Sequence, residues 1–333
     1  MSFPIISPVF YKELTDSSKE ENDGVKYNVT ISPEAVEYSF PLYQEKVVRK
    51  LMEMKEIIPF SRQESNPETI KKYLVRRDEL VEKYPQLEHY WQGRVVMMNA
   101  IQDRGYSIEK RMLIMNFMCK SMQNAIDNAR GNELQPFING FLQSPDRSKI
   151  MDFFKTLKPN FLFSVMDALS MLRGMPSTPE FDEVRKTVFD RLGYPEDEKE
   201  AENYSFEKHL PEYLNMKKYF FADYLRQGEE DSKEYYLENV MMNYIWTFTM
   251  PFADYRLSLW ENFVFYNVIF NTVKVMLTCY ITAENGDEGF VKAITAFDSS
   301  VQEIDGSMAD VTFRAVEARG FDTNGDMAIL SMS

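Results

Sequence analysis

The sequence is short of the residues that metal and nucleotide sites use. Its 333 residues include two cysteines, two histidines and 13 glycines. Cys119 and Cys279 both lie in apolar stretches, where we expect buried, inert thiols. Two cysteines cannot make a cysteine-only zinc or iron–sulfur site in a single chain. The chain has neither a glycine-rich dinucleotide loop nor a Walker sequence, which argues against a Rossmann-type methyltransferase or dehydrogenase.

Basic residues are also in deficit. Lysine and arginine number 38 against 52 aspartate and glutamate residues, which gives a formal net charge of −14. Binding to nucleic acid requires a basic face for the phosphates, so this charge argues against a nucleic-acid partner. It argues equally against an anionic membrane surface. It favours a basic partner, such as a lysine-bearing protein, although net charge speaks mainly to solubility and association.

Signals for export and for membrane insertion are missing too. The first residues, MSFPIISPVF, lack the basic region and the long apolar region of a signal peptide. The apolar stretch 263–281 has the length of a membrane span, but Asn267, Asn271 and Lys274 interrupt it. A lysine at the centre of a membrane span raises the free energy of membrane insertion. We therefore expect a cytoplasmic protein without a membrane span.

The sequence does contain the pattern of a large helical core. Hydrophobic residues make up 44% of the chain, and 21 methionines against 13 glycines favour helices. Because no segment alternates strongly enough for a sheet core, we predict an all-α fold, a multi-helix array with a short irregular or β-like N-terminal arm. Composition divides it into an arm (1–33), an N-terminal helical half (34–175), an acidic connector (176–204), a C-terminal helical half with a central hairpin (205–319) and a mobile tail (320–333).

The central hairpin is the stretch from Tyr235 to Ile281, which Pro251 divides into two apolar helices. A proline followed by a short polar turn suits an antiparallel pair. Each helix carries one polar stripe at helical spacing: Tyr236, Asn239, Asn243 and Thr247 in the first, and Asn267, Asn271, Lys274 and Thr278 in the second. In an antiparallel pair we expect Asn243 to lie near Asn271. Asn239 is then expected near Lys274.

Two interpretations of these stripes stay open. In the structural one, the polar groups pair within the core, and Lys274 bonds to Glu238 or to another carboxylate. In the functional one, they line a ligand pocket inside the bundle, and its binding residues are Tyr236, Asn239, Asn243, Asn271 and Lys274. Aromatic neighbours together with an acidic group would suit a lysine ammonium through cation–π contacts.

A second candidate lies at a helix–helix corner, residues 102–111. In the structural interpretation, Asp103 and Arg104 cap and clamp the corner through ion pairs. In the functional interpretation, Arg104 and Arg111 bind an anionic group such as a carboxylate, because the planar guanidinium matches that geometry.

Several of these residues resemble the flagellin lysine-N-methylase family. The run from Leu237 to Asn239, followed by Asn243-Tyr244, Pro251-Phe252 and Lys274, looks like the C-terminal half of that family. The segment IQDRGYSIEKRM, residues 101–112, is similar to the family's Leu-Gln-x-Arg-x-Tyr-x-x-x-x-Arg corner. The segment VKYNVTISPEAVEY resembles its early strand and helix entry. The resemblance implies methyl transfer to lysine side chains on flagellin, with S-adenosylmethionine and an iron–sulfur cluster.

The chain departs from the family in its cysteines. Family members carry cysteine clusters near the N-terminus and after the first long helix, whereas residues 12–24 and 59–67 contain none. We therefore expect a lysine-N-methylase-like protein with S-adenosylmethionine, without an iron–sulfur cluster, and with a lysine-bearing partner such as flagellin. Two alternatives stay open: a non-catalytic binding or scaffold protein that lost the iron–sulfur site, and a metal-free small-molecule enzyme that uses the central helical pocket.

Overall fold

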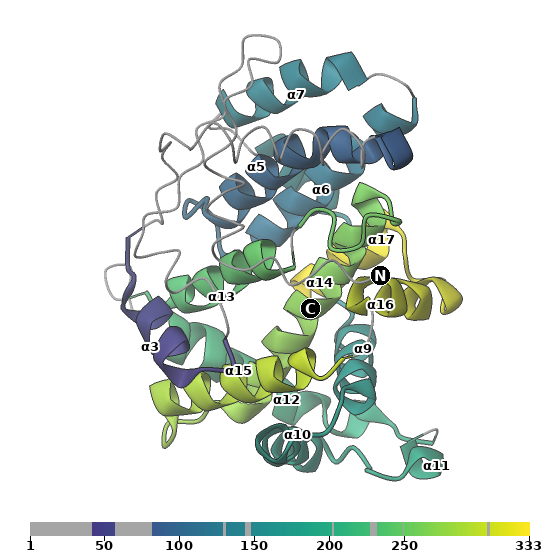
Figure 1. The fold of residues 1–333 in the computed structure, drawn as a ribbon. Helices are drawn as coiled ribbons and strands as arrows, with labels where there is room; N and C mark the ends of the chain where they lie inside the picture. The colour runs from purple at the N-terminus through teal and green to yellow at the C-terminus, as the bar shows by residue number, and fades with distance from the viewer. Residues whose placement is uncertain are drawn as a thin grey trace.

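The computed structural model describes residues 42–56, 82–128, 131–143, 148–201, 203–226, 232–248, 250–304 and 307–333. In these residues, helices joined by turns make up the whole fold and no β-strand occurs (Figure 1). The prediction of an all-α fold is confirmed. The predicted arm, residues 1–33, lies outside the described residues.

The described residues form helices in the following order along the chain. They are α3 (Glu45–Glu53), η1 (Pro85–His89), α5 (Tyr90–Ile101), α6 (Ile108–Asp127), α7 (Gly131–Gln143), α8 (Ser148–Phe154), α9 (Phe161–Gly174), α10 (Pro179–Leu192), α11 (Glu198–Ala201), η2 (Phe206–Lys208), α12 (Leu210–Lys218), the π-helical segment η3 (Tyr219–Leu225), α13 (Glu234–Thr247), α14 (Leu259–Tyr280), α15 (Gly286–Gln302), α16 (Met308–Ala318) and α17 (Asn324–Met332).

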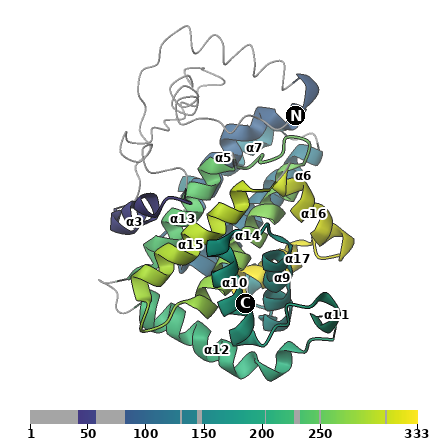
Figure 2. The same cartoon turned by 60° about the horizontal axis from the view of Figure 1, so that its bottom comes forward.

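Helix α14 is the centre of the array. A capping box fixes its start, because Ser258 Oγ accepts from the Glu261 N–H and the Glu261 carboxylate accepts from the Ser258 N–H. Every residue of α14 except Glu261 is buried. A helix that is buried all round has neighbours on every side. The helices α6, α9, α10, α12, α15, α16 and α17 supply them (Figures 1 and 2).

The same helix has the length and composition of a membrane span. In the described part of the chain, α14 meets that description, and its most apolar window is entirely buried by other helices. The core helix of a globular array has the same length and composition, so this feature alone does not distinguish the two.

Helices α13 and α14 do not form the expected hairpin with facing stripes. Helix α13 packs on α3 and α5, on a side of the molecule away from most neighbours of α14. The two helices touch where the Tyr266 hydroxyl donates to the Met241 carbonyl at 3.0 Å. Pro251 does separate them, as predicted, in a turn that contains several buried residues. The prediction of an antiparallel pair with opposed polar lines is therefore wrong.

The acidic connector contains a packed helix. The Thr178 side chain accepts from the Phe181 N–H and begins α10, with Pro179 in the first turn. Helix α10 buries Phe181, Val184 and three further apolar residues against α14 and α15. The prediction of a flexible connector is therefore wrong for residues 179–192. The acidic residues of this segment lie on the solvent-facing side of α10, and its apolar residues pack against other helices. The division of the chain into two helical halves stays a prediction.

The predicted mobile tail is also a packed helix. Thr323 and Asp326 form a capping box at the start of α17. Met327, Ala328 and Leu330 are buried against α6 and α14. The expectation of a mobile tail is therefore wrong.

Candidate functional site

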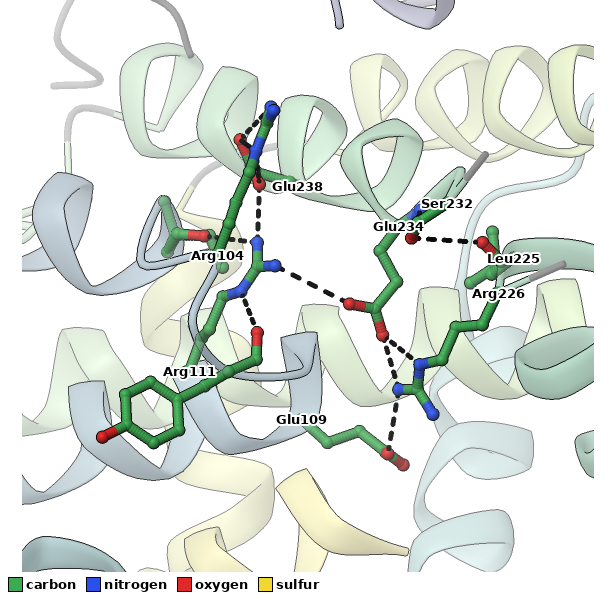
Figure 3. A network of polar contacts seen from close by, with 10 residues as sticks. Arg104, Glu109, Arg111, Leu225, Arg226, Ser232, Glu234 and Glu238 are labelled. Carbon is green, nitrogen blue, oxygen red and sulfur yellow. Dashed lines mark hydrogen bonds and ion pairs between the residues drawn. The ribbon is translucent and has the colours of Figure 1, made fainter. Parts of the chain in front are cut away.

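Arg104 and Arg111 hold the carboxylate of Glu238 from two sides (Figure 3). Arg104, in the turn between α5 and α6, donates from Nε and Nη2 at 2.9 and 2.8 Å. Arg111, on α6, donates from Nη1 at 2.5 Å. The side chain of Glu238 is completely buried. A buried carboxylate is stable in such a place only while its partners stay paired with it.

The charges alternate in sign beyond this carboxylate. Arg111 Nη2 lies 3.6 Å from Glu234, and Glu234 accepts from Arg226 Nε at 2.6 Å. Arg226 Nη2 lies 3.9 Å from Glu109, which pairs with Lys217 at 3.0 Å. The network joins α6, α12, η3 and α13 into one unit, as Figure 3 shows for most of it.

The two arginines have little capacity left for an external anion. The remaining donors of Arg111 go to the carbonyls of Tyr106 and Ile101, at 2.7 and 3.0 Å. Arg104 Nη1 donates to the carbonyl of Lys55 at 2.5 Å. The carboxylate that the sequence suggested for this corner is present, but it belongs to the chain itself. A ligand role for these arginines stays a prediction.

Lys274 holds the end of α17. Its Nζ donates to the carbonyls of Leu330 and Ser331 at 2.8 and 3.3 Å, where a helix C-terminus favours a donor. Burial lowers the pKa of Lys274 well below its ordinary value, and the nearby charge of Lys217 lowers it further. The expected pair with Glu238 is wrong, because Glu238 is bonded to arginines.

Two asparagines of the stripes, Asn239 and Asn271, bond to other helices. Asn239 Nδ2 donates to the carbonyls of Leu51 and Met54, at 2.8 and 3.0 Å, and so caps α3. Asn271 accepts from the Ser164 hydroxyl at 2.6 Å and donates to the Ser164 carbonyl at 2.9 Å. Neither amide bonds to the residue expected opposite it, so those predicted pairs are wrong.

Asn243 differs from the rest of the stripe. In the described part of the chain, neither atom of its side-chain amide has a hydrogen-bond partner, although the residue is buried. Among the described residues, the hydroxyl of the adjacent Tyr244 is likewise buried without a hydrogen-bond partner. Burial raises the pKa of Tyr244, and the charge of Asp298 raises it further. Burial also raises the pKa of Asp298, to about 7.

Tyr236 belongs to a cluster that sequence reasoning did not assemble. Asp287 accepts from the hydroxyls of Tyr224 and Tyr236 at 2.9 and 3.3 Å. The same carboxylate accepts from Lys233 Nζ at 2.8 Å. That ammonium lies 5.1 Å from the ring centre of Tyr224 and 5.6 Å from that of Tyr236. We call Tyr224, Tyr236 and Asp287 the acid–aromatic cage.

Three elements position the cage. Tyr224 lies on η3, whose π-helical geometry is frequent at functional sites. Tyr236 lies in the first turn of α13. Asp287 lies in the first turn of α15, where the helix dipole stabilises a carboxylate. The site therefore depends on how distant helices pack.

The cage has a buried floor and an open mouth. Tyr224 and Tyr236 are 3% and 6% exposed, whereas the side chains of Asp287 and Lys233 are 44% and 29% exposed. Burial raises the pKa of both tyrosines, and the charge of Asp287 raises it further. Both hydroxyls therefore stay protonated and donate to the carboxylate. A carboxylate beside two ring faces is chemically suited to an alkylammonium group.

The donor atoms of the chain do not fit a cysteine-ligated iron–sulfur cluster. The whole sequence has two cysteines, Cys119 on α6 and Cys279 on α14, and both are buried. Burial raises the pKa of both thiols, which disfavours the thiolate that binds iron. Within the described ranges, no group of three His, Cys, Asp or Glu side chains is arranged to hold a metal ion.

Sequence reasoning found one residue of the cage and missed the others. Tyr236 was part of the predicted stripe, and an acidic, aromatic surrounding for a lysine was expected there. Asp287 lies 51 residues further along the chain and Tyr224 lies on another element. The signal that was available was local: the chain reads EYY immediately after Lys233, which places aromatic rings beside a lysine.

The fold and the cage define an all-helical protein that holds a lysine ammonium between a carboxylate and two aromatic rings. The sequence model of the FliB lysine N-methylase C-terminal domain matches residues 94–330, and the chain belongs to this family. The matched range includes the arginine corner and the whole cage. No curated protein and no solved structure matches the chain significantly.

Proposed function

We propose that this protein binds the lysine side chain of a protein substrate in the acid–aromatic cage and methylates it with S-adenosylmethionine. One observation carries the proposal: an ammonium already lies against the Asp287 carboxylate and over the rings of Tyr224 and Tyr236. Membership of a lysine N-methylase family supports the same substrate class.

Each part of the cage has a distinct role in this proposal. The two tyrosine rings attract the cation through their faces and orient the Cε–Nζ bond. Asp287 holds and orients the ammonium at the open mouth of the cage, where one proton leaves to solvent before the amine acts as a nucleophile. S-adenosylmethionine supplies an electrophilic methyl group when it is bound. The net charge of −14 favours encounter with a lysine-rich surface.

Flagellin is the proposed partner, and the cytoplasm is the proposed location of the reaction. Flagellin follows from the family, whose activity is lysine N-methylation. The cage adds a chemical requirement: the side chain that enters must carry a charged, alkyl-linked nitrogen.

A second candidate function is recognition of lysine without methyl transfer. The cysteine content favours it, because the two buried thiols do not fit the cluster implied by the resemblance. The cage does not depend on that cluster. A scaffold that retained the cage would still bind lysine side chains.

One experiment separates these functions. Wild-type protein is titrated with flagellin and, separately, with S-adenosylmethionine in a calorimeter, and transfer of a labelled methyl group to flagellin is measured. Asp287→Asn is expected to weaken flagellin binding about tenfold, because a charge-assisted contact worth about 1.4 kcal/mol is lost. The control Glu288→Gln, next in sequence and paired with Arg49, is expected to bind as wild type does.

The outcomes are distinct. Transfer that requires Asp287 supports the methylase. Binding that requires Asp287, without affinity for S-adenosylmethionine at millimolar concentration, supports recognition alone. Equal binding of flagellin before and after acetylation of its lysines would overturn both.

A further inference from the structure

We infer that Lys233 is an internal competitor for the acid–aromatic cage, which an incoming lysine side chain must displace. The inference rests on the proposed function, since it concerns the regulation of the same site. Its starting point is that the cage is occupied by the ammonium of the chain's own Lys233.

The backbone of Lys233 is fixed independently of its side chain. Its N–H donates to the Leu225 carbonyl at 2.6 Å, and its carbonyl accepts from the Tyr236 N–H at 2.9 Å. These bonds join the end of η3 to the start of α13. The side chain can therefore leave the cage by rotation about its own bonds, while both cage tyrosines stay in place.

The solvent exposure of Lys233 and Asp287 allows the Lys233 ammonium to be replaced by another ammonium. The Lys233 and Asp287 side chains reach solvent, whereas the rings beneath them do not. Rotamer changes of such side chains take picoseconds to nanoseconds. When Lys233 leaves, the carboxylate and the ring faces stay in position for another ammonium.

Lys217 gives a useful contrast within the same molecule. It also lies over two rings, 5.1 Å from the centre of Phe161 and 5.5 Å from that of Phe221. However, its ammonium pairs with Glu109 at 3.0 Å and donates to the carbonyls of Met332 and Ser333. Its side chain is 16% exposed. Lys217 is thus a structural link between helices, and an exchange with external lysine is not expected there.

An internal competitor sets a threshold for binding. A tethered group acts at an effective concentration on the order of millimolar. A single free lysine has to exceed that concentration to enter. A protein that presents its lysine while other parts of its surface bind nearby reaches such a local concentration easily. Lys233 therefore selects docked protein substrates against free amino acid.

The test uses the full chain and a small probe, Nα-acetyl-L-lysine methylamide, with ligand-observed NMR titration. Lys233→Ala is expected to bind the probe about tenfold more tightly than wild type, because the tethered competitor is gone. Lys233→Gln, which keeps side-chain length without the charge, is expected to give the same gain. The double variant Lys233→Ala/Asp287→Asn is expected to lose it.

Two controls make the result specific. Lys186→Ala removes an exposed lysine that pairs with Asp190 on α10 at 2.7 Å, and it is expected to leave probe affinity unchanged. The Nε-acetylated probe, which carries no charge, is expected not to bind any variant.

The outcomes separate this inference from the proposed function. Equal affinity of wild type and both Lys233 variants, with binding still dependent on Asp287, overturns the competitor and leaves lysine recognition standing. Absence of probe binding in every variant, with circular dichroism showing intact helices, overturns both. A gain in Lys233→Ala that persists in the double variant would also overturn the competitor, because the cage would not be the binding site.

Discussion

Two regions of this molecule hold charged groups in opposite ways. In the core, Glu238 is enclosed by two arginines and Lys274 by two backbone carbonyls, without access to solvent. At the acid–aromatic cage, Lys233 and Asp287 meet over buried rings but face solvent themselves. In both regions a charged group is bonded to a group of opposite charge or to a hydrogen-bond acceptor. Only at the cage are both partners exposed enough for another ammonium to replace the bound one.

The difference teaches that residue type is a poor guide to function in a helical core. Lys274 and Arg111 attract attention in the sequence because charges in apolar helices are costly. The chain itself satisfies them, so their effect is mainly on structure. Lys233 and Asp287 look like ordinary surface residues. Their surroundings make them suitable for a ligand.

The largest expected effect is on the free energy of unfolding, which should fall more for a variant in the core than for one at the cage. Glu238→Ala leaves two arginines facing an empty site, one of them almost fully buried, and is expected to cost about 3–5 kcal/mol. Lys233→Ala removes a partly exposed partner of Asp287, leaves the bonds of both cage tyrosines to Asp287 in place, and is expected to cost about 1 kcal/mol or less. Urea unfolding measures both. Equal losses would show that the two regions do not differ in the way proposed.

The next effect concerns pH. Burial lowers the pKa of Lys274, so between this lowered pKa and the ordinary lysine value near 10.4 the unfolded chain binds more protons than the folded one. The stabilising contribution of this residue therefore rises with pH over that interval, by up to about 1.4 kcal/mol per pH unit. Lys274→Met keeps the volume and removes the titrating group.

The measurement for Lys274 is the difference in unfolding free energy between wild type and Lys274→Met, followed from pH 7 upward. The difference is expected to grow in favour of wild type as pH rises. Parallel curves for Lys274→Met would mean that its ammonium is as well solvated as an exposed one.

Much of the fold could be predicted because its signals are local. The helix after Pro251 begins with a capping box formed by Ser258 and Glu261, and most of its residues are apolar. Helix α17 was missed although Thr323 and Asp326 carry the same signal. With nine residues, α17 is too short for its apolar spacing to indicate a helix clearly in the sequence.

The site could be predicted only in part because it depends on contacts between distant segments. The spacing of Asn239 and Asn271 correctly indicated polar groups on buried helix faces. Which faces meet is decided by the packing of all the helices, and α3 and α9 supplied the partners instead. No pattern within α13 could indicate that Asp287 would lie beside Tyr236.

The smallest expected effect concerns Asn243, a polar residue of the predicted stripe on α13 that belongs to neither region. Asn243 is buried, and in the described residues its amide atoms have no partner. Asn243→Leu removes an unsatisfied amide and adds apolar contacts, so we expect a gain of about 1 kcal/mol in the free energy of unfolding. Asn271→Leu is the matched control, expected to lose about 2 kcal/mol because Ser164 would lose its partner. Urea unfolding of both variants measures these changes, and probe binding at the cage is a second readout.

A loss of stability in Asn243→Leu would show that the Asn243 amide is satisfied in solution, by water or by a ligand. The core would then contain a second site beside the open cage.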